Sequence, residues 1–329
     1  MYPSISNAPS WTLYFNITEG CNNSCCFCAS NSPEQEKHYI STEIVCNSLK
    51  KYKLDANSHI VINGGEPTTH PGFMQILNCA IETGGRVTLF TNGRSFASKK
   101  HNSNPAIQNL QRISIPLYGA QQDVHDQLVG RKGAWEQTVA GLKNLDALRN
   151  SNLGPEELEL KLLAVGPSLS EWPKIITFLD RIIRPPERVV LSGLILSNTL
   201  LAHRQELIPT MQNLLLPINE TIRRLREIRI KLILLWEIPW CLLDNDNLEY
   251  FLETRHQNRS KKKMPVVKDV YFDYRFPEGI ELSPKNQETS EDEALMCENC
   301  KLRSCCNGVP AYIRLAREGT NVLHLSSTR

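Results

Sequence analysis

Hydrophobic residues recur with two periods between residue 12 and about residue 236. Short runs rich in Ile, Val and Leu and bounded by Gly or Pro predict strands, and they alternate with longer amphipathic segments that predict helices. The strand candidates are WTLYFNI, HIVINGGEP, RVTLFTNG, ISIPLYG, LELKLLAVG, RVVLSGLIL and RIKLILLWEI. Such alternation is typical of right-handed βαβ units. We therefore expect an α/β fold, a partial (β/α)6 TIM-like barrel with its chemistry at the carboxyl ends of the strands.

The alternation stops near Cys241, and the remainder is polar and poor in apolar runs. We assign residues 1–236 to the barrel and residues 237–329 to a C-terminal extension. Within the extension, KDVYFDYRFPEGIELSP predicts two short strands around a Pro-Glu-Gly turn. A segment this small rarely supports an independent core, so a bound metal is expected to hold it.

The charge balance limits the classes of partner. Lys and Arg number 37 against 35 Asp and Glu in 329 residues, so no strong overall field attracts nucleic acid or a membrane surface. No signal peptide precedes the first strand, and no apolar stretch approaches the roughly 18 residues of a membrane span. We expect a cytoplasmic protein, where paired cysteines are more often metal ligands or redox groups than disulfides.

Most of the eleven cysteines form two tight groups at opposite ends of the chain. One group lies at positions 21, 25, 26 and 28, and the other at 297, 300, 305 and 306. Two such groups in a long chain indicate two metal sites rather than a disulfide scaffold. Cys46 and Cys79 lie in helical patterns and are expected to be buried core thiols.

Cys21, Cys25 and Cys28 have the spacing C-x3-C-x2-C in the loop after the first strand. A structural zinc site usually needs four protein ligands, whereas three thiolates on one loop suit an iron–sulfur cubane with one iron left open. The pattern resembles the radical SAM superfamily, in which this triad binds a [4Fe–4S] cluster whose open iron chelates S-adenosylmethionine. Cys26 lies outside this spacing and is interpreted as a packed or partly exposed thiol.

Further motifs carry the same resemblance. GGEP follows the second strand, TNG follows the third, and ISIPLYG forms the fourth. In the family, Glu66 would accept from the methionine ammonium, and Phe27 would lie beside the adenine. The positions that the resemblance assigns to cofactor binding are Phe27, Gly64, Gly65, Glu66, Pro67, Thr91, Asn92 and Ser114.

The resemblance implies a reaction and its partners. The reduced cluster would cleave S-adenosylmethionine to a 5′-deoxyadenosyl radical, which abstracts hydrogen from a peptide or a small biosynthetic intermediate. Electrons would come from a flavodoxin- or ferredoxin-like donor. Because the first strand begins near residue 12, we expect no leader-recognition module ahead of the barrel. This expectation slightly favours a small molecule, or a peptide recognised through a separate partner, as the substrate.

The second group resembles a SPASM or twitch extension, which binds an auxiliary [4Fe–4S] cluster. Cys297, Cys300 and Cys306 have the spacing C-x2-C-x5-C, and Cys241 is the candidate fourth ligand because it follows the last barrel strand. Cys305 could replace Cys306, and a zinc site with four thiolates is an alternative.

Two other functions remain open at this stage. The auxiliary cluster could be the sulfur donor of a radical sulfur insertion. The chain could also be an iron–sulfur sensor without turnover, although a sensor has no need of the acceptor that Glu66 would offer to a cofactor ammonium.

Overall fold

The computed structural model describes residues 10–29, 38–98, 102, 104–258, 267–273, 275–282, 297, 300–302, 306 and 308–316. Its strands are β1 Ser10–Asn16, β2 His59–Asn63, β3 Arg86–Phe90, β4 Arg112–Pro116, β5 Glu157–Leu163, β6 Arg188–Ser192, β7 Leu232–Trp236, β8 Val267–Asp273 and β9 Phe276–Leu282.

Helices alternate with the first seven strands. They are α1 Thr42–Lys51, α2 Phe73–Glu82, α4 Pro105–Gln108, α5 Gln122–Val129, α6 Ala134–Asn150, α7 Trp172–Asp180, α8 Asn198–Ala202, α9 Arg204–Leu207 and α10 Met211–Glu227. Two more helices follow β7, α11 Asn245–Asn258 and α13 Ala311–Leu315. Short 3₁₀ turns lie at Pro67–Thr69, Arg94–Ala97, Gly166–Glu171 and Trp240–Leu242. None of these helices is both long and apolar enough to cross a membrane.

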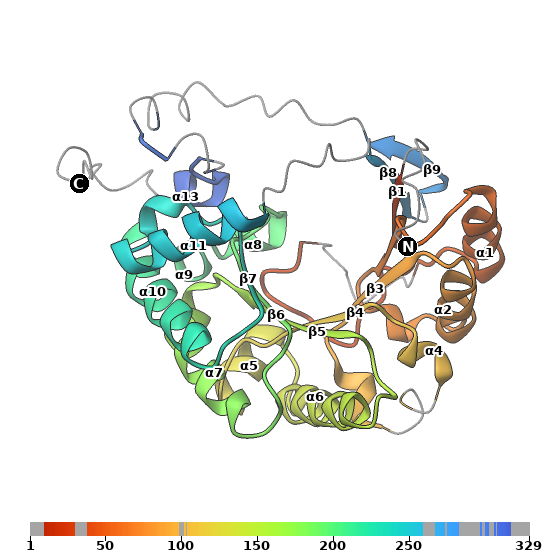
Figure 1. Ribbon diagram of the computed structural model, residues 1–329, viewed down its shortest axis with the longest axis horizontal. Coiled ribbons are helices and arrows are strands. Elements are labelled where there is room, and N and C mark those ends of the chain that lie inside the picture. The colour runs from red at the N-terminus through yellow and green to blue at the C-terminus, as the bar shows by residue number, and fades with distance from the viewer. Residues whose placement is uncertain are drawn as a thin grey trace.

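The strands form one sheet in the order β7-β6-β5-β4-β3-β2-β1-β8-β9. All neighbouring pairs are parallel except the last, in which β8 and β9 are antiparallel. The sheet curves, and the helices from α1 to α10 lie along its convex side (Figure 1). The α/β expectation is confirmed: the molecule is a partial barrel, open between β7 and β9.

Alternation along β5 explains the two faces of this sheet. Leu158, Leu160 and Leu162 are at most 1% exposed and face the helices, as expected for a strand covered on its outer side. Glu157 and Glu159 point to the concave side, which we call the lumen. There Arg112 donates to Glu157 at 2.8 Å and Arg188 donates to Glu159 at 2.9 Å. Paired charges thus fill the lumen near the amino ends of these strands.

The extension begins differently from the expectation. Residues 267–273 add to the sheet, because β8 pairs in parallel with β1. The hairpin turn lies between Asp273 and Phe276, and the Pro-Glu-Gly sequence lies within β9. Asp273 explains this turn, because its carboxylate accepts from the backbone N–H groups of Arg275 and Phe276 at 2.8 and 3.0 Å.

The C-terminal segment has apolar contacts with the barrel. Val309, Tyr312 and Ile313 are at most 4% exposed, and the Tyr312 hydroxyl donates to the Glu237 carbonyl at 3.1 Å. Gly193 permits this approach, since a Cβ there would lie 2.7 Å from the Tyr312 ring. Apolar burial therefore contributes to docking this segment, in addition to any metal.

The expectation that Cys46 and Cys79 are free core thiols is wrong. Cys46 lies on α1 and Cys79 on α2, and the structure joins them in a disulfide. The two residues are separated by 33 positions, so only the packing of α1 against α2 brings them together.

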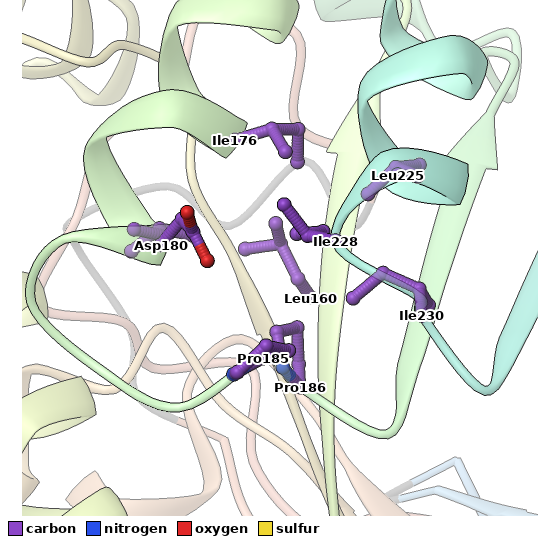
Figure 2. A pocket seen from close by; sticks show the side chains of 9 residues that line it. Leu160, Ile176, Asp180, Pro185, Pro186, Leu225, Ile228 and Ile230 are labelled. Atoms are coloured by element: carbon purple, nitrogen blue, oxygen red, sulfur yellow. The ribbon is translucent and has the colours of Figure 1, made fainter.

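A small apolar cavity lies between α7, α10 and β5 (Figure 2). Leu160, Ile176, Leu225 and Ile228 line it on the helix side of the sheet. No cysteine borders it. The cavity is a packing gap between outer helices and the sheet, remote from the lumen.

Candidate functional site

The loop that carries the first cysteines follows β1 at its carboxyl end. Backbone hydrogen bonds hold it on two sides: Glu66 N donates to Gly20 O at 2.8 Å, and Ser24 N donates to Val129 O at 2.8 Å. The loop is therefore fixed between the end of β2 and the end of α5. Its conformation depends on residues more than 40 and 100 positions away in the chain.

Cys21, Cys25 and Cys28 lie close enough for their charges to interact. Burial, and then the neighbouring Cys28 and Cys21, raise the pKa of Cys25 far above its usual range. Burial raises the pKa of Cys21 to about 11, although the backbone N–H of Asn23 donates to its sulfur at 3.3 Å. Three clustered soft donors fit an iron–sulfur cluster, whose positive irons would displace the thiol protons.

Cys26 makes a different contact. Its Sγ lies 3.6 Å from the Leu128 carbonyl oxygen, and its backbone N–H donates to the same oxygen at 3.2 Å. The thiol is thus engaged with the end of α5.

Glu66 is buried at the centre of the site, with 1% of its surface exposed. One carboxylate oxygen accepts from the hydroxyls of Thr68 and Thr91, both at 2.6 Å, and the other accepts from Asn92 N at 2.7 Å. Burial raises the pKa of Glu66, and these hydrogen bonds oppose that rise. The carboxylate therefore joins the ends of β2 and β3. Its second oxygen keeps acceptor capacity for another donor.

Gly64 and Gly65 permit a close approach of two backbone segments. A Cβ on Gly64 would lie 2.5 Å from the Thr18 carbonyl oxygen, and one on Gly65 would lie 2.4 Å from that of Glu19. Side chains at these positions would push the cysteine loop away from β2. Pro67 then begins the 3₁₀ turn Pro67–Thr69.

Asn92 and Arg94 bind the cysteine loop directly. The Asn92 side chain donates to Asn22 Oδ1 at 2.6 Å. The Arg94 guanidinium donates to Asn23 Oδ1 at 2.6 Å, to the carbonyl of Asn22, and to Gln137 Oε1 at 2.8 Å. Arg94 was not identified from the sequence, because a single arginine after a strand carries no spacing signal.

Phe27 packs edge-on against Tyr118, with ring centroids 4.9 Å apart. Both rings are at most 7% exposed, so they shield one side of the cysteine loop from water. Tyr118, which follows β4, was also missed by sequence reasoning. Its hydroxyl lies near the thiols, and burial followed by the nearby Cys25 raises the pKa of Tyr118 well above its usual range.

Ser114 occupies a different place from the other expected residues. It lies inside β4, and its hydroxyl donates to Glu159 Oε1 at 2.8 Å. Ser114 is thus hydrogen-bonded to one of the paired charges of the lumen. Its side chain has no described hydrogen bond to the cysteine loop.

The second group of cysteines gathers after β7. Cys241 is an exposed residue, yet desolvation of its thiol, followed by the neighbouring Cys306, Cys300 and Cys297, raises the pKa of Cys241 to about 11. Trp240 N donates to the Cys306 sulfur at 3.4 Å, which ties the two segments together. Cys305 lies outside the described residues. The donor set of four neighbouring thiols fits either an auxiliary cluster or zinc by ligand type.

Among the described residues, no group of three or more His, Cys, Asp or Glu side chains is arranged to hold a metal ion. Ligand type therefore leaves both alternatives open for this group of thiols.

A comparison with known families decides the identity of the core. The radical SAM superfamily profile matches residues 15–153, the part that contains the cysteine loop, GGEP and TNG. The chain carries a radical SAM domain. The resemblance inferred from the motifs is therefore confirmed, and the domain is that of an enzyme superfamily.

Curated relatives share this radical SAM region. The AdoMet-dependent heme synthase of Methanosarcina barkeri is 30% identical over 146 residues, 43% of this chain and 40% of that protein. The sporulation killing factor maturation protein SkfB of Bacillus subtilis is 28% identical over 130 residues, 39% of this chain and 31% of that protein. The mycofactocin maturase MftC of Mycolicibacterium smegmatis is 24% identical over 159 residues, 48% of this chain and 39% of that protein. The chain thus matches less than half the length of each relative.

Solved structures support the fold over a longer region. The crystal structure of Streptococcus suis SuiB bound to S-adenosylmethionine has a TM-score of 0.55 with 12% identity. The match covers 80% of this chain and 59% of SuiB. At this identity the similarity concerns the fold.

Proposed function

We propose that this chain reductively cleaves S-adenosylmethionine and uses the resulting radical to abstract hydrogen from a peptide or a small biosynthetic intermediate. The observation that supports this proposal most directly is that Cys21, Cys25 and Cys28 gather beside the buried, hydrogen-bonded Glu66. SkfB and MftC are named as a maturation protein and a maturase, and a SuiB structure contains the precursor peptide SuiA. These names favour a peptide substrate over a small molecule.

The residues of the chain have separate tasks in this proposal. Cys21, Cys25 and Cys28 would hold the first [4Fe–4S] cluster, which when bound with S-adenosylmethionine supplies one-electron cleavage of the sulfonium and a 5′-deoxyadenosyl radical. Glu66 would accept from the methionine ammonium while it holds the ends of β2 and β3. Phe27 would exclude water beside the cofactor.

Other expected cofactor contacts surround the same carboxylate. Gly64, Gly65 and Pro67 set the course of the chain before and after Glu66, and Thr91 and Asn92 hydrogen-bond to it. Ser114 is the weakest member of this set, because its hydroxyl is engaged with Glu159.

Cys241, Cys297, Cys300 and Cys306 would hold an auxiliary [4Fe–4S] cluster that assists oxidation or binds substrate. The support is the proximity of the four thiols after β7. A flavodoxin- or ferredoxin-like protein would supply the electrons.

The direct test measures release of 5′-deoxyadenosine from S-adenosylmethionine by the reconstituted, reduced full-length chain. We expect release by the wild type and none by the Cys21→Ala/Cys25→Ala/Cys28→Ala variant. A wild type that binds iron and S-adenosylmethionine without cleaving it would support the sensor alternative instead.

Metal analysis tests the auxiliary cluster. The triple variant should retain about four irons per chain, and these should disappear when Cys297 and Cys300 are also replaced by Ala. Stoichiometric zinc in that position, or no metal after anaerobic reconstitution, would contradict the auxiliary cluster and leave the first cluster unaffected.

A further inference from the structure

Lys161 places a positive charge inside the lumen. It lies on β5 on the same face as Glu157 and Glu159, opposite the core residues Leu160 and Leu162. Its ammonium lies 5.8 Å from the ring centroid of Phe90 and 5.2 Å from that of Trp236. Phe90 ends β3 and Trp236 ends β7, so this lysine reaches across the concave side toward the carboxyl ends of the strands.

The charge of Lys161 has no ionic partner in the described part of the chain. The nearby carboxylates are engaged elsewhere, because Arg112 pairs with Glu157 and Arg188 pairs with Glu159. No described residue forms a hydrogen bond or ion pair with the Lys161 ammonium. Burial lowers the pKa of Lys161, and Glu159 only partly opposes this effect.

Lys161 is partly buried, and an ammonium that loses water without gaining an ion pair is costly. The two aromatic rings compensate only part of the lost hydration. Proteins normally pair such charges. We therefore look for the ionic partner of Lys161 in the molecule that enters the lumen. An ammonium group pairs best with an anionic oxygen group. The Trp236 ring, 41% exposed, lies beside it and offers an apolar face.

The position of Lys161 assigns this anion to the substrate. Glu66, Thr91 and Asn92, the groups proposed for the cofactor, cluster at the ends of β2 and β3. Lys161 and Trp236 come from β5 and β7, and β7 leads to Cys241. A substrate located between the two groups of cysteines would pass this pair.

We propose that Lys161 binds a carboxylate of the substrate, with the adjacent apolar part of that substrate against Trp236. This inference rests on the proposed function for the existence of a substrate in the lumen. The ligand class is a carboxylate attached to an apolar or aromatic group, such as an acidic side chain or the C-terminus of a peptide.

The test uses 3-phenylpropionate and its neutral amide as probes, with the full-length, cluster-reconstituted chain loaded with S-adenosylmethionine. Ligand-detected NMR titration should show millimolar binding of the acid and at least about tenfold weaker binding of the amide. Lys161→Met should remove this preference, whereas Lys161→Arg should retain it. Lys143→Met, an exposed lysine on α6, is the matched control and should behave as wild type.

Several outcomes would overturn the assignment. One is equal binding of acid and amide, another is absence of acid binding, and a third is an unchanged preference in Lys161→Met. A Lys161→Met variant that loses affinity for S-adenosylmethionine but keeps its affinity for decarboxylated S-adenosylmethionine would assign the anion to the cofactor. That result would also overturn the proposal.

Thermal unfolding provides a second measurement. Removing an unpaired, partly buried charge should leave the melting temperature of Lys161→Met equal to or above that of wild type, because methionine keeps an apolar contact with the two rings. A decrease would show that the ammonium is already paired within the protein and would contradict the proposal. The 5′-deoxyadenosine assay keeps the two proposals separable. Acid preference without cofactor cleavage would contradict the proposed function alone, and cleavage without acid preference would contradict the lysine subsite alone.

Discussion

Arg94 donates a hydrogen bond to Asn23 Oδ1 at 2.6 Å and thereby ties the residue that follows TNG to the loop between Cys21 and Cys25. Replacing Arg94 by Gln should loosen this loop and remove a positive charge beside Cys21. We expect lower iron retention and a first-cluster reduction potential lower by on the order of tens of millivolts. Electrochemical titration and iron analysis measure both effects.

The Arg94→Lys variant separates the two effects, because lysine keeps the positive charge but lacks the planar guanidinium that donates to several acceptors. Its reduction potential should be closer to the wild-type value than its iron content. Lys132→Gln, an exposed lysine before α6, is the control. An unchanged potential in Arg94→Gln would remove the electrostatic role and leave only a structural one.

The cysteines of the first group should respond differently to substitution. Cys26→Ala should retain the first cluster of about four irons, because its thiol contacts the Leu128 carbonyl and lies outside the triad spacing. Cys25→Ala should lose that cluster and cofactor cleavage. The reverse result would show that the triad has been assigned to the wrong positions.

Glu66 should affect stability as well as cofactor binding. Glu66→Ala leaves the donors of Thr68, Thr91 and Asn92 without their acceptor, which should cost on the order of 3 kcal/mol of unfolding free energy. Iron–sulfur absorbance should persist while affinity for S-adenosylmethionine falls at least about tenfold.

Glu66→Gln separates these effects, since it keeps the shape and one acceptor but removes the charge. It should recover part of the stability and little of the affinity. Cofactor affinity at the wild-type level in both variants would exclude Glu66 from the cofactor site.

The lowered pKa of His59 predicts that the folded protein loses stability at acidic pH. Burial, and then the charges of Arg86, Arg112 and Arg188, lower its pKa to about 4, and its ring nitrogen lies 2.9 Å from Thr88 Oγ1. Because the unfolded chain binds a proton near pH 6.5 and the folded chain does not, stability should fall as the pH decreases from about 6.5 to about 4.

The contribution of His59 over this range should be on the order of 2 kcal/mol. Chemical denaturation at several pH values measures it. His59→Gln should have a shallower pH profile than wild type, and parallel profiles would contradict the assignment.

The Cys46–Cys79 disulfide should stabilise the packing of α1 against α2. Opening a loop of 33 residues should lower the unfolding free energy by about 3–4 kcal/mol. Melting with and without a thiol reductant measures the loss, and alkylation with mass spectrometry identifies the two thiols. A Cys46→Ser/Cys79→Ser variant should be insensitive to the reductant; equal sensitivity in both proteins would place the effect elsewhere.

The sequence by itself determined the features that are local in the chain. Apolar periodicity is a local property, so it predicted β1 to β7 and their helices. Cys21, Cys25 and Cys28 share one loop, so their spacing alone indicated an iron–sulfur site. The radical SAM domain could be predicted for this reason, before any contact between distant residues was known.

Tertiary structure decided the relationships that depend on register and packing between distant segments. Curvature of the sheet brought the Lys161 ammonium near the rings of Phe90 and Trp236, which lie two strands away on either side, and helix packing joined Cys46 to Cys79. Likewise, β8 pairs with β1 although more than 240 residues separate them, and Arg94 reaches a loop 71 positions earlier. Such contacts have no sequence period, because their energy comes from side chains that meet only after the sheet has curved and the helices have covered it.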